Sequence, residues 1–335
     1  MNNNQKPQII QSIKKHFEIF QLHSKYVLCI LILDKNRIVT GSLCSISISN
    51  INYNSQTWHT QIHIPNAHND WILYLSNLNH NRLISCSSDN TFKIWEHSIN
   101  DKLILITSIN IHTQKVLKVI SLTNNIIVSI SYDRTIKFWE DITFKQQNIP
   151  FEKQENIPSC IIQLKHKENE LCISTSNVDD NYSNANNYNS NILFYNINFP
   201  YNLKGKINGV NTNSKNGMIE LQNGNIALSN STNYPNKIII INPFQYTIIT
   251  EIIDTTYING TGSLRVFDNE SFIYTCLGRI CQIAFINHKY QLVYKKKAKF
   301  QELFGSNGVI MTHNDKYIIT STLNGNNGIN IYKWE

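Results

Sequence analysis

A histidine, a serine and an aspartate recur in this sequence at a fixed spacing, and they are the residue types of a nucleophilic hydrolase. His68, Ser85 and Asp89 could serve as base, nucleophile and orienting carboxylate. The same three types return 44 residues later, in the same order and at the same spacing. This second set is His112, Ser129 and Asp133. A catalytic nucleophile has no reason to be duplicated at a regular interval, so the pattern favours a structural repeat over catalysis.

A longer phrase surrounds these residues in both places. Residues 83–96 read LISCSSDNTFKIWE and residues 127–140 read IVSISYDRTIKFWE, with seven of the fourteen positions identical. Each phrase places its aspartate six residues before a tryptophan, Trp95 or Trp139. A repeat of about 40–45 residues is the length expected of one blade of a β-propeller.

The elements around the repeat are short strands. Apolar runs rich in Ile, Val, Tyr and Phe are broken about every 8–12 residues by Asn, Asp, Gly or Ser, which is typical of an all-β protein. In the second repeat we predict four antiparallel strands, at residues 71–75, 82–87, 91–96 and 103–109. The third repeat has the same four, at 116–122, 126–131, 135–140 and 143–149. The rest of the chain divides by the same rhythm, so we predict a seven-bladed β-propeller with four antiparallel strands per blade.

The two ends of the chain complete each other. The last unit is one strand short, and a spare strand at residues 13–20 precedes the first unit. We therefore predict that the N-terminal strand joins the last blade and closes the ring, which removes an open sheet edge. On this interpretation residues 1–335 form one propeller domain, with a flexible tail at 1–12 and an exposed insertion loop at 177–190.

The repeated phrase resembles the WD40 repeat family. Trp95-Glu96 and Trp139-Glu140 stand for the family's Trp-Asp pair, and Ala67-His68 and Ile111-His112 stand for its Gly-His pair. The resemblance implies a buried chain of hydrogen bonds from His and Asp through a strand hydroxyl to the Trp indole. Its predicted members are His68, Ser85, Asp89 and Trp95 in one blade and His112, Ser129, Asp133 and Trp139 in the next, with Ser87 and Ser131 as alternative hydroxyls.

The first unit keeps only part of this motif. His23 and Thr40 have the expected spacing, but Cys44 stands where the aspartate belongs and no tryptophan follows. The predicted first strands of the first three units, YVLCILIL, WILYLS and VLKVISL, are mostly apolar. Catalysis at the centre of a propeller needs convergent charged residues on these strands, so we expect no enzyme.

Composition and charge narrow the functional classes and the cellular compartments that fit this sequence. The formal charge is +7 with a pI near 8.9, which favours acidic partners only weakly. Seven cysteines without a CxxC pair suggest reduced thiols. The sequence contains no apolar stretch long enough for a membrane span, and its N-terminus does not resemble a signal peptide. We expect an intracellular protein, cytoplasmic with the nucleus as the alternative, with no cofactor and no metal.

The top rim of a propeller, where the turns between second and third strands meet the segments that join blades, commonly binds partners in the family. Tyr and Arg are favoured at interfaces. The residues predicted for this rim are Tyr132, Arg134, Tyr234, Arg279, Lys295, Lys296 and Lys297. We predict a non-catalytic protein–protein interaction scaffold. The alternative is a basic propeller that binds nucleic acid or ribonucleoprotein through the run 295–299 and through Lys14 and Lys15.

Overall fold

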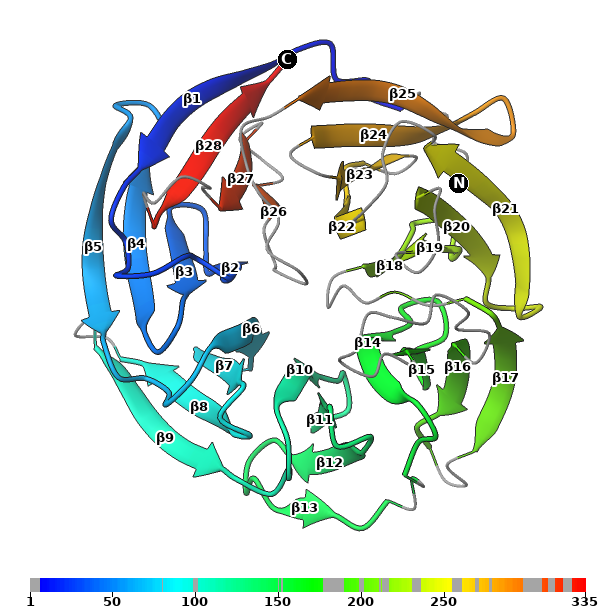
Figure 1. The fold of residues 1–335 in the computed structure, drawn as a ribbon, viewed down its shortest axis with the longest axis horizontal. Coiled ribbons are helices and arrows are strands. Elements are labelled where there is room, and N and C mark those ends of the chain that lie inside the picture. The colour runs from blue at the N-terminus through cyan, green and yellow to red at the C-terminus, as the bar shows by residue number, and fades with distance from the viewer. Residues whose placement is uncertain are drawn as a thin grey trace, which may run out of the picture.

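The computed structural model describes residues 7–335 except 80, 99–101, 150, 152, 177–189, 199–201, 211, 213–216, 231–235, 255–260, 269–270, 277–278, 298–308, 313–316 and 322–326. Every regular element among the described residues is a strand. The strands form seven four-stranded sheets arranged as blades around a central axis (Figure 1). None of the described segments is a helix that could cross a membrane. The predicted all-β, seven-bladed propeller is confirmed.

Strands follow one another outward from the centre in each of the first six blades. Blade 1 contains β2 (Cys29–Ile32), β3 (Arg37–Gly41), β4 (Ile46–Asn52) and β5 (Thr57–Ile64). Blade 2 contains β6 (Ile72–Leu78), β7 (Arg82–Ser87), β8 (Phe92–His97) and β9 (Leu103–Ile109). Blade 3 contains β10 (Val116–Ser121), β11 (Ile126–Ser131), β12 (Ile136–Glu140) and β13 (Gln146–Gln147). The outer strand β13 is much shorter than the predicted 143–149.

The less regular units follow the same order. Blade 4 contains β14 (Ile157–Gln163), β15 (Glu170–Ser176), β16 (Asn191–Asn196) and β17 (Leu203–Asn208). Blade 5 contains β18 (Met218–Glu220), β19 (Ile226–Asn230), β20 (Asn236–Asn242) and β21 (Thr247–Asp254). Blade 6 contains β22 (Thr261–Val266), β23 (Ser271–Cys276), β24 (Arg279–Ile286) and β25 (Lys289–Lys297).

Blade 7 unites the two ends of the chain. Its strands are β26 (Val309–Thr312), β27 (Tyr317–Ser321), β28 (Ile329–Trp334) and β1 (Ile13–Ile19), with β1 outermost and antiparallel to β28. The predicted closure by the N-terminal strand is therefore confirmed. Figure 1 shows β1 lying beside β28 in the outer wall of the ring.

The N-terminal segment predicted to be a flexible tail makes contacts in its described part. The backbone N–H of Ile10 donates to the Gln282 side chain at 2.8 Å, and Ile10 is buried. The Gln282 amide in turn donates to the Gln8 carbonyl at 2.6 Å. These contacts hold residues 8–10 against blade 6. The buried Ile10 side chain anchors this segment, although most of the residues that precede it are polar.

The hydrophobic cores lie between blades. Each of the seven core clusters of described residues combines side chains from two neighbouring blades, the last joining blade 7 to blade 1. The packing follows from alternation along each strand, which places apolar residues on both faces of every sheet. Because every blade needs both neighbours, an open ring would expose two apolar sheet faces.

Candidate functional site

A chain of four buried side chains connects separate elements of blade 2. The Trp95 indole N–H donates to Ser85 Oγ at 2.8 Å, and Ser85 Oγ contacts His68 Nε2 at 2.7 Å. His68 Nδ1 contacts Asp89 Oδ2 at 2.9 Å. With Nδ1 protonated, every donor in the chain finds an acceptor. The chain links β8, β7, the segment before β6 and the turn after β7.

Blade 3 contains the same chain with nearly the same distances. Trp139 donates to Ser129 Oγ at 3.0 Å, Ser129 contacts His112 Nε2 at 2.8 Å, and His112 Nδ1 contacts Asp133 Oδ2 at 2.9 Å. The hydroxyls of Ser87 and Ser131, predicted as alternatives, form other hydrogen bonds. Ser87 donates to the Asp70 carbonyl, and Ser131 donates to the Gln114 and Lys115 carbonyls.

The electrostatics of the chain explain its protonation states. Burial alone would raise the pKa of the Asp89 carboxyl, but hydrogen bonds from His68, Thr91 and the Asn69 backbone N–H outweigh it and hold this pKa well below its usual range. Burial lowers the pKa of His68. A neutral imidazole therefore lies between a hydroxyl and an ionised carboxylate. Asp133 has a lowered pKa for the same reasons.

These distances would also suit a catalytic triad, but the surroundings of Ser85 and His68 do not. Ser85 has no exposed surface and His68 is 1% exposed. The serine oxygen already accepts the Trp95 N–H. No substrate carbonyl can approach a nucleophile that is enclosed between sheets. The chain is a structural network, as its duplication suggests.

Blade 1 retains the histidine but replaces its partner. His23 Nε2 contacts Thr40 Oγ1 at 2.8 Å, and His23 Nδ1 contacts Ser45 Oγ at 2.6 Å. Cys44 has the sequence position of the aspartate, but it is the next residue, Ser45, that contacts His23 Nδ1. Thr40 pairs with Ser47, seven residues on, whereas Ser85 pairs with Lys93, eight residues on. The shorter turn shifts the register by one residue and brings the serine hydroxyl to the histidine.

The top rim of blades 1 to 3 exposes large side chains that the network does not use. Trp71 is 43% exposed, although Trp95 and Trp139 are buried. Tyr26 precedes β2 and Ile111 precedes β10, and both are also exposed. The Lys115 ammonium lies 4.2 Å from the centroid of the Tyr132 ring. Sequence reasoning missed Trp71, although its position outside the repeated Trp-Glu phrase is a signal that could have found it.

Two of the predicted rim residues lie in the turn between β11 and β12. Tyr132 donates its backbone N–H to the Lys115 carbonyl at 3.0 Å. Arg134 is exposed and has a φ of 68°, in the left-handed region. Its position within a tight turn projects the side chain from the rim surface.

The other predicted rim residues belong to blades 5 and 6. Lys295 lies on the outer strand β25, near its end on the top rim. The backbones of Arg279, Lys296 and Lys297 pair at the same end. The side chains of these three residues, the whole of Tyr234 and residues 177–189 of the predicted insertion lie outside the described residues.

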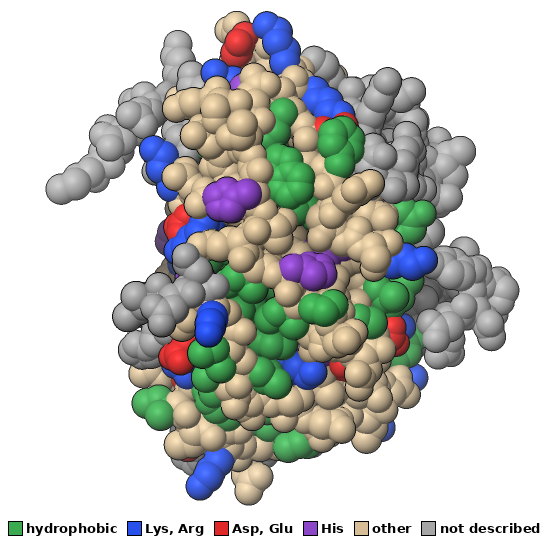
Figure 2. All heavy atoms as spheres, turned by 90° about the vertical axis from the view of Figure 1, so that its left-hand side faces the viewer, with side chains coloured by type: hydrophobic (Ala, Val, Ile, Leu, Met, Phe, Trp, Pro, Cys, Tyr) green, Lys and Arg blue, Asp and Glu red, His purple; other side chains and the backbone are tan. Residues whose placement is uncertain are grey.

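Where they are described, the basic residues of the nucleic-acid alternative lie on different rims of the ring. Lys14 and Lys15 lie at the start of β1, on the bottom rim, whereas Lys295 lies at the top end of β25. Lys14 forms an ion pair with Glu335 at 3.7 Å, and Lys15 forms one with Glu18. On the side of the ring formed by β1, β5 and β9, basic and acidic side chains are scattered among neutral ones (Figure 2). The arrangement does not favour a continuous phosphate-binding track.

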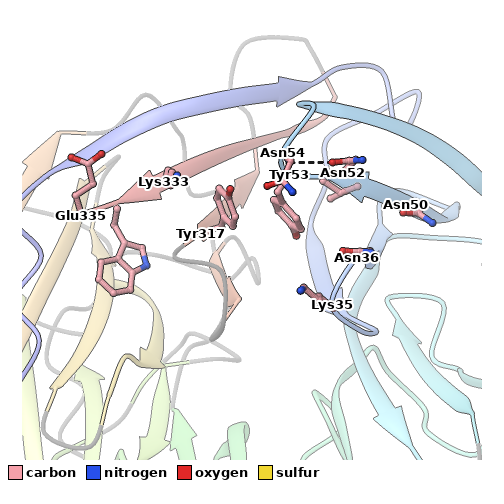
Figure 3. A pocket seen from close by; sticks show the side chains of 11 residues that line it. Lys35, Asn36, Asn50, Asn52, Tyr53, Asn54, Tyr317, Lys333 and Glu335 are labelled. Atoms are coloured by element: carbon pink, nitrogen blue, oxygen red, sulfur yellow. Dashed lines mark hydrogen bonds between the residues drawn. The ribbon is translucent and has the colours of Figure 1, made fainter. Parts of the chain in front are cut away.

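A pocket of about 800 Å³ lies on the bottom rim at the seam between blade 7 and blade 1 (Figure 3). Tyr53 and Tyr317 stack at its centre, with ring centroids 4.4 Å apart. Asn36, Asn50 and Lys333 are among the polar residues around them, so the pocket offers hydrogen bonds to a polar ligand.

Among the described residues, no group of three or more His, Cys, Asp or Glu residues could hold a metal ion.

The fold defines this protein as a seven-bladed β-propeller, and blades 2 and 3 carry the same buried network. The family model described as "WD40: WD domain, G-beta repeat" matches residues 59–96 and 104–140. These segments contain β7, β8, β11 and β12, which carry the Ser and Trp residues of both networks. Blades 2 and 3 are therefore similar to WD40 repeats, and the whole chain folds as a seven-bladed β-propeller. A search of curated proteins found no match.

Proposed function

We propose that this propeller is a non-catalytic interaction scaffold that binds another protein on the top rim of blades 1 to 3. WD40 propellers are generally protein-interaction scaffolds. The observation that carries the proposal is that Trp71 is exposed on the rim next to the hydrogen-bond network of blade 2, in which every donor has an acceptor. We define the docking surface as six residues: Tyr26, Trp71, Ile111, Lys115, Tyr132 and Arg134.

The residue types of the docking surface support this proposal. Trp, Tyr and Arg are enriched among the residues that contribute most to binding energy at interfaces. Large rings bury much apolar area at a small cost in side-chain entropy. Lys115 and Arg134 add positive charge, so a partner segment with aromatic or aliphatic groups flanked by acidic residues would fit best.

The backbone beneath the docking surface is held in place. The backbone N–H of Trp71 donates to Asp70 Oδ1 at 2.7 Å, and its carbonyl accepts the Ser88 N–H at 2.9 Å. Ser87 also donates to the Asp70 carbonyl at 3.0 Å. A preorganised surface loses little entropy on binding. The structural network therefore serves binding indirectly, by fixing the positions of the anchors.

The test is affinity purification of the tagged protein from its own cells, followed by mass spectrometry, at low and moderate salt and with and without nuclease. We expect a set of partner proteins that survives nuclease. The double substitution Trp71→Ala with Tyr132→Ala should remove it. The matched control is Ile142→Ala, because Ile142 is 77% exposed on the bottom rim and should be dispensable.

Two results would contradict the proposal. One is an identical partner set for the wild type and the double variant when circular dichroism shows both to be folded. The other is the loss of all partners on nuclease treatment, which would indicate nucleic acid as the main ligand.

A further inference from the structure

Two seams between neighbouring blades contain a cation that the next blade binds on the bottom rim. Between blades 2 and 3, the Arg82 guanidinium donates to Asp141 Oδ1 at 3.0 Å. Between blades 4 and 5, the Lys167 ammonium donates to the Pro243 carbonyl at 3.1 Å and to the Tyr246 hydroxyl at 3.3 Å. In both seams, acceptors of the protein itself satisfy the cation.

The seam between blades 7 and 1 contains the pocket of about 800 Å³ instead. Figure 3 shows Lys35 on the blade 1 side of this pocket and Lys333 on the blade 7 side. Both lysines are exposed, and neither forms an ion pair with a residue that the structure describes. Glu335 also lines the pocket, but it pairs with Lys14 at 3.7 Å. The two lysine ammonium groups are therefore placed to pair with an anionic ligand.

Asparagine amides line the same pocket. Asn50 and Asn52 are alternate residues of β4, so their side chains project from the same face of the strand, about 6.5–7 Å apart. Asn36, in the turn before β3, adds a third amide. Within the described part of the chain, the side chains of Asn36 and Asn50 form no hydrogen bond. Each of these amides can both donate to a ligand and accept from it.

The base of the pocket is held in place. The Tyr53 and Tyr317 rings stack across the seam with centroids 4.4 Å apart. Asn52 Oδ1 accepts the backbone N–H groups of Asn54 and Ser55, both at 3.1 Å, which fixes the turn that carries Tyr53. Each tyrosine is only 6% exposed, so these two rings support the pocket and offer no open face to a sugar or a base.

The lining favours a peptide over a small organic molecule. Small-molecule sites are mostly apolar with a few polar groups, whereas exposed amides and ammonium groups surround this pocket. An extended peptide repeats its N–H and C=O groups every two residues, which is the interval between Asn50 and Asn52. Carboxylates form strong charge-assisted hydrogen bonds with ammonium groups, so the peptide should be acidic.

We propose that the seam between blades 7 and 1 binds an extended acidic segment of a partner protein. The amides of Asn36, Asn50 and Asn52 would bond to the backbone of the segment. Lys35 and Lys333 would pair with its carboxylates from the two sides of the pocket. Because the docking surface lies on the opposite rim, a propeller that uses both sites would join two partner chains. The two sites are separate, so either can fail without the other.

The test is selection of random peptides displayed on phage against the full-length chain, followed by fluorescence anisotropy with synthetic copies of the enriched peptides. We expect peptides rich in aspartate and glutamate. Lys35→Glu with Lys333→Glu should weaken their binding about tenfold or more, because it reverses both charges of the pocket. The matched control is Lys145→Glu with Lys289→Glu, which makes the same change at exposed lysines near the bottom-rim turns of blades 3 and 6.

A neutral substitution separates backbone recognition from general attraction between charges. Asn50→Ala should weaken binding of the same peptides several-fold while the Tm stays that of the wild type. Unaltered affinity in Asn50→Ala would contradict the assigned backbone contacts.

Four further results would overturn the proposal. They are the enrichment of no peptide, the enrichment of peptides without acidic residues, and equal binding by the two double lysine variants. The fourth is a set of acidic peptides whose binding depends on Trp71 and Tyr132 instead, which would assign them to the docking surface.

Discussion

At the scale of single residues, the same histidine position has two environments. His68 faces an ionised aspartate, whereas His23 faces the neutral Ser45 and lies 5.9 Å from the His63 ring. Burial lowers the pKa of His23 to about 3, and His63 adds to the effect. In the folded protein His23 therefore stays neutral at pH values where an unfolded chain protonates it.

This pKa difference predicts an acid-sensitive contribution to stability from His23. The contribution is fully present above the unfolded pKa of about 6.5 and falls as the pH decreases toward 3, by up to about 1.4 kcal/mol per pH unit. His23→Gln keeps a polar side chain but does not titrate. We expect the free energy of unfolding of His23→Gln to fall less steeply than that of the wild type between pH 6.5 and 4.5.

Urea denaturation at several pH values measures this slope. His59→Gln is the matched control, because it makes the same substitution at a histidine that is exposed on β5. Parallel profiles for His23→Gln and the wild type would show that His23 does not remain neutral in the folded state.

At the scale of the element, the hydrogen-bond network joins pieces of a blade that the strand ladders leave unconnected. Ser129 Oγ on β11 contacts both the Trp139 indole on β12 and His112 in the segment that precedes β10. The inter-blade segment thus depends on a side-chain bond for its position. Since that segment also carries Ile111 of the docking surface, the network couples stability to the shape of the rim.

Ser129→Ala should destabilise the protein by about 2–4 kcal/mol, because it orphans both a buried indole N–H and a buried imidazole nitrogen. In a Trp139→Phe background the indole N–H is absent, so the same substitution should cost about 1–2 kcal/mol less. Chemical denaturation of the four members of this cycle measures the coupling. Additive costs would mean that Ser129 and Trp139 do not act together.

At the scale of the whole molecule, stability depends on the closure of blade 7. β1 pairs with β28 from Ile13 opposite Trp334 to Ile19 opposite Ile329. Gly328 lies where these strands begin to pair on the top rim. A Cβ on Gly328 would lie 1.8 Å from the Ile19 carbonyl oxygen and 2.8 Å from its carbon, both backbone atoms that cannot rotate away.

Gly328→Ala should therefore displace β1 and destabilise the protein by at least about 1–3 kcal/mol. Hydrogen exchange of the β1 amides should accelerate more than exchange in blade 3. Gly209→Ala is the contrasting substitution, because Gly209 has a φ of 74° but no atoms within 4 Å of an added Cβ. Its backbone strain should not affect β1. Unchanged exchange of β1 in a folded Gly328→Ala protein would refute the role of this close approach.

Much of this architecture could be predicted because it repeats. The spacing of His68, Ser85, Asp89 and Trp95, duplicated in the next unit, is a local pattern that buried polar groups require, since each must find a partner within its own blade. Strand rhythm and the strand missing from the last unit likewise indicated seven blades and their closure. The strand register of blade 1 could not be predicted. Its turn between the second and third strands is one residue shorter than that of blade 2, so Ser45 rather than Cys44 contacts His23. The flanking apolar residues do not indicate this shift.

The sequence by itself determined the class of fold and the two networks, because periodic burial and hydrogen-bond satisfaction are imposed residue by residue along the chain. Only the tertiary structure decided which residues from different blades meet. Trp71 became part of a surface because neighbouring blades place Tyr26 and Tyr132 on the same rim. The Lys118 ammonium came to lie 5.0 Å from the Tyr74 ring and 3.6 Å from Cys160 Sγ because the ring places the inner strands of blades 2, 3 and 4 side by side, a relation that no spacing along the chain encodes.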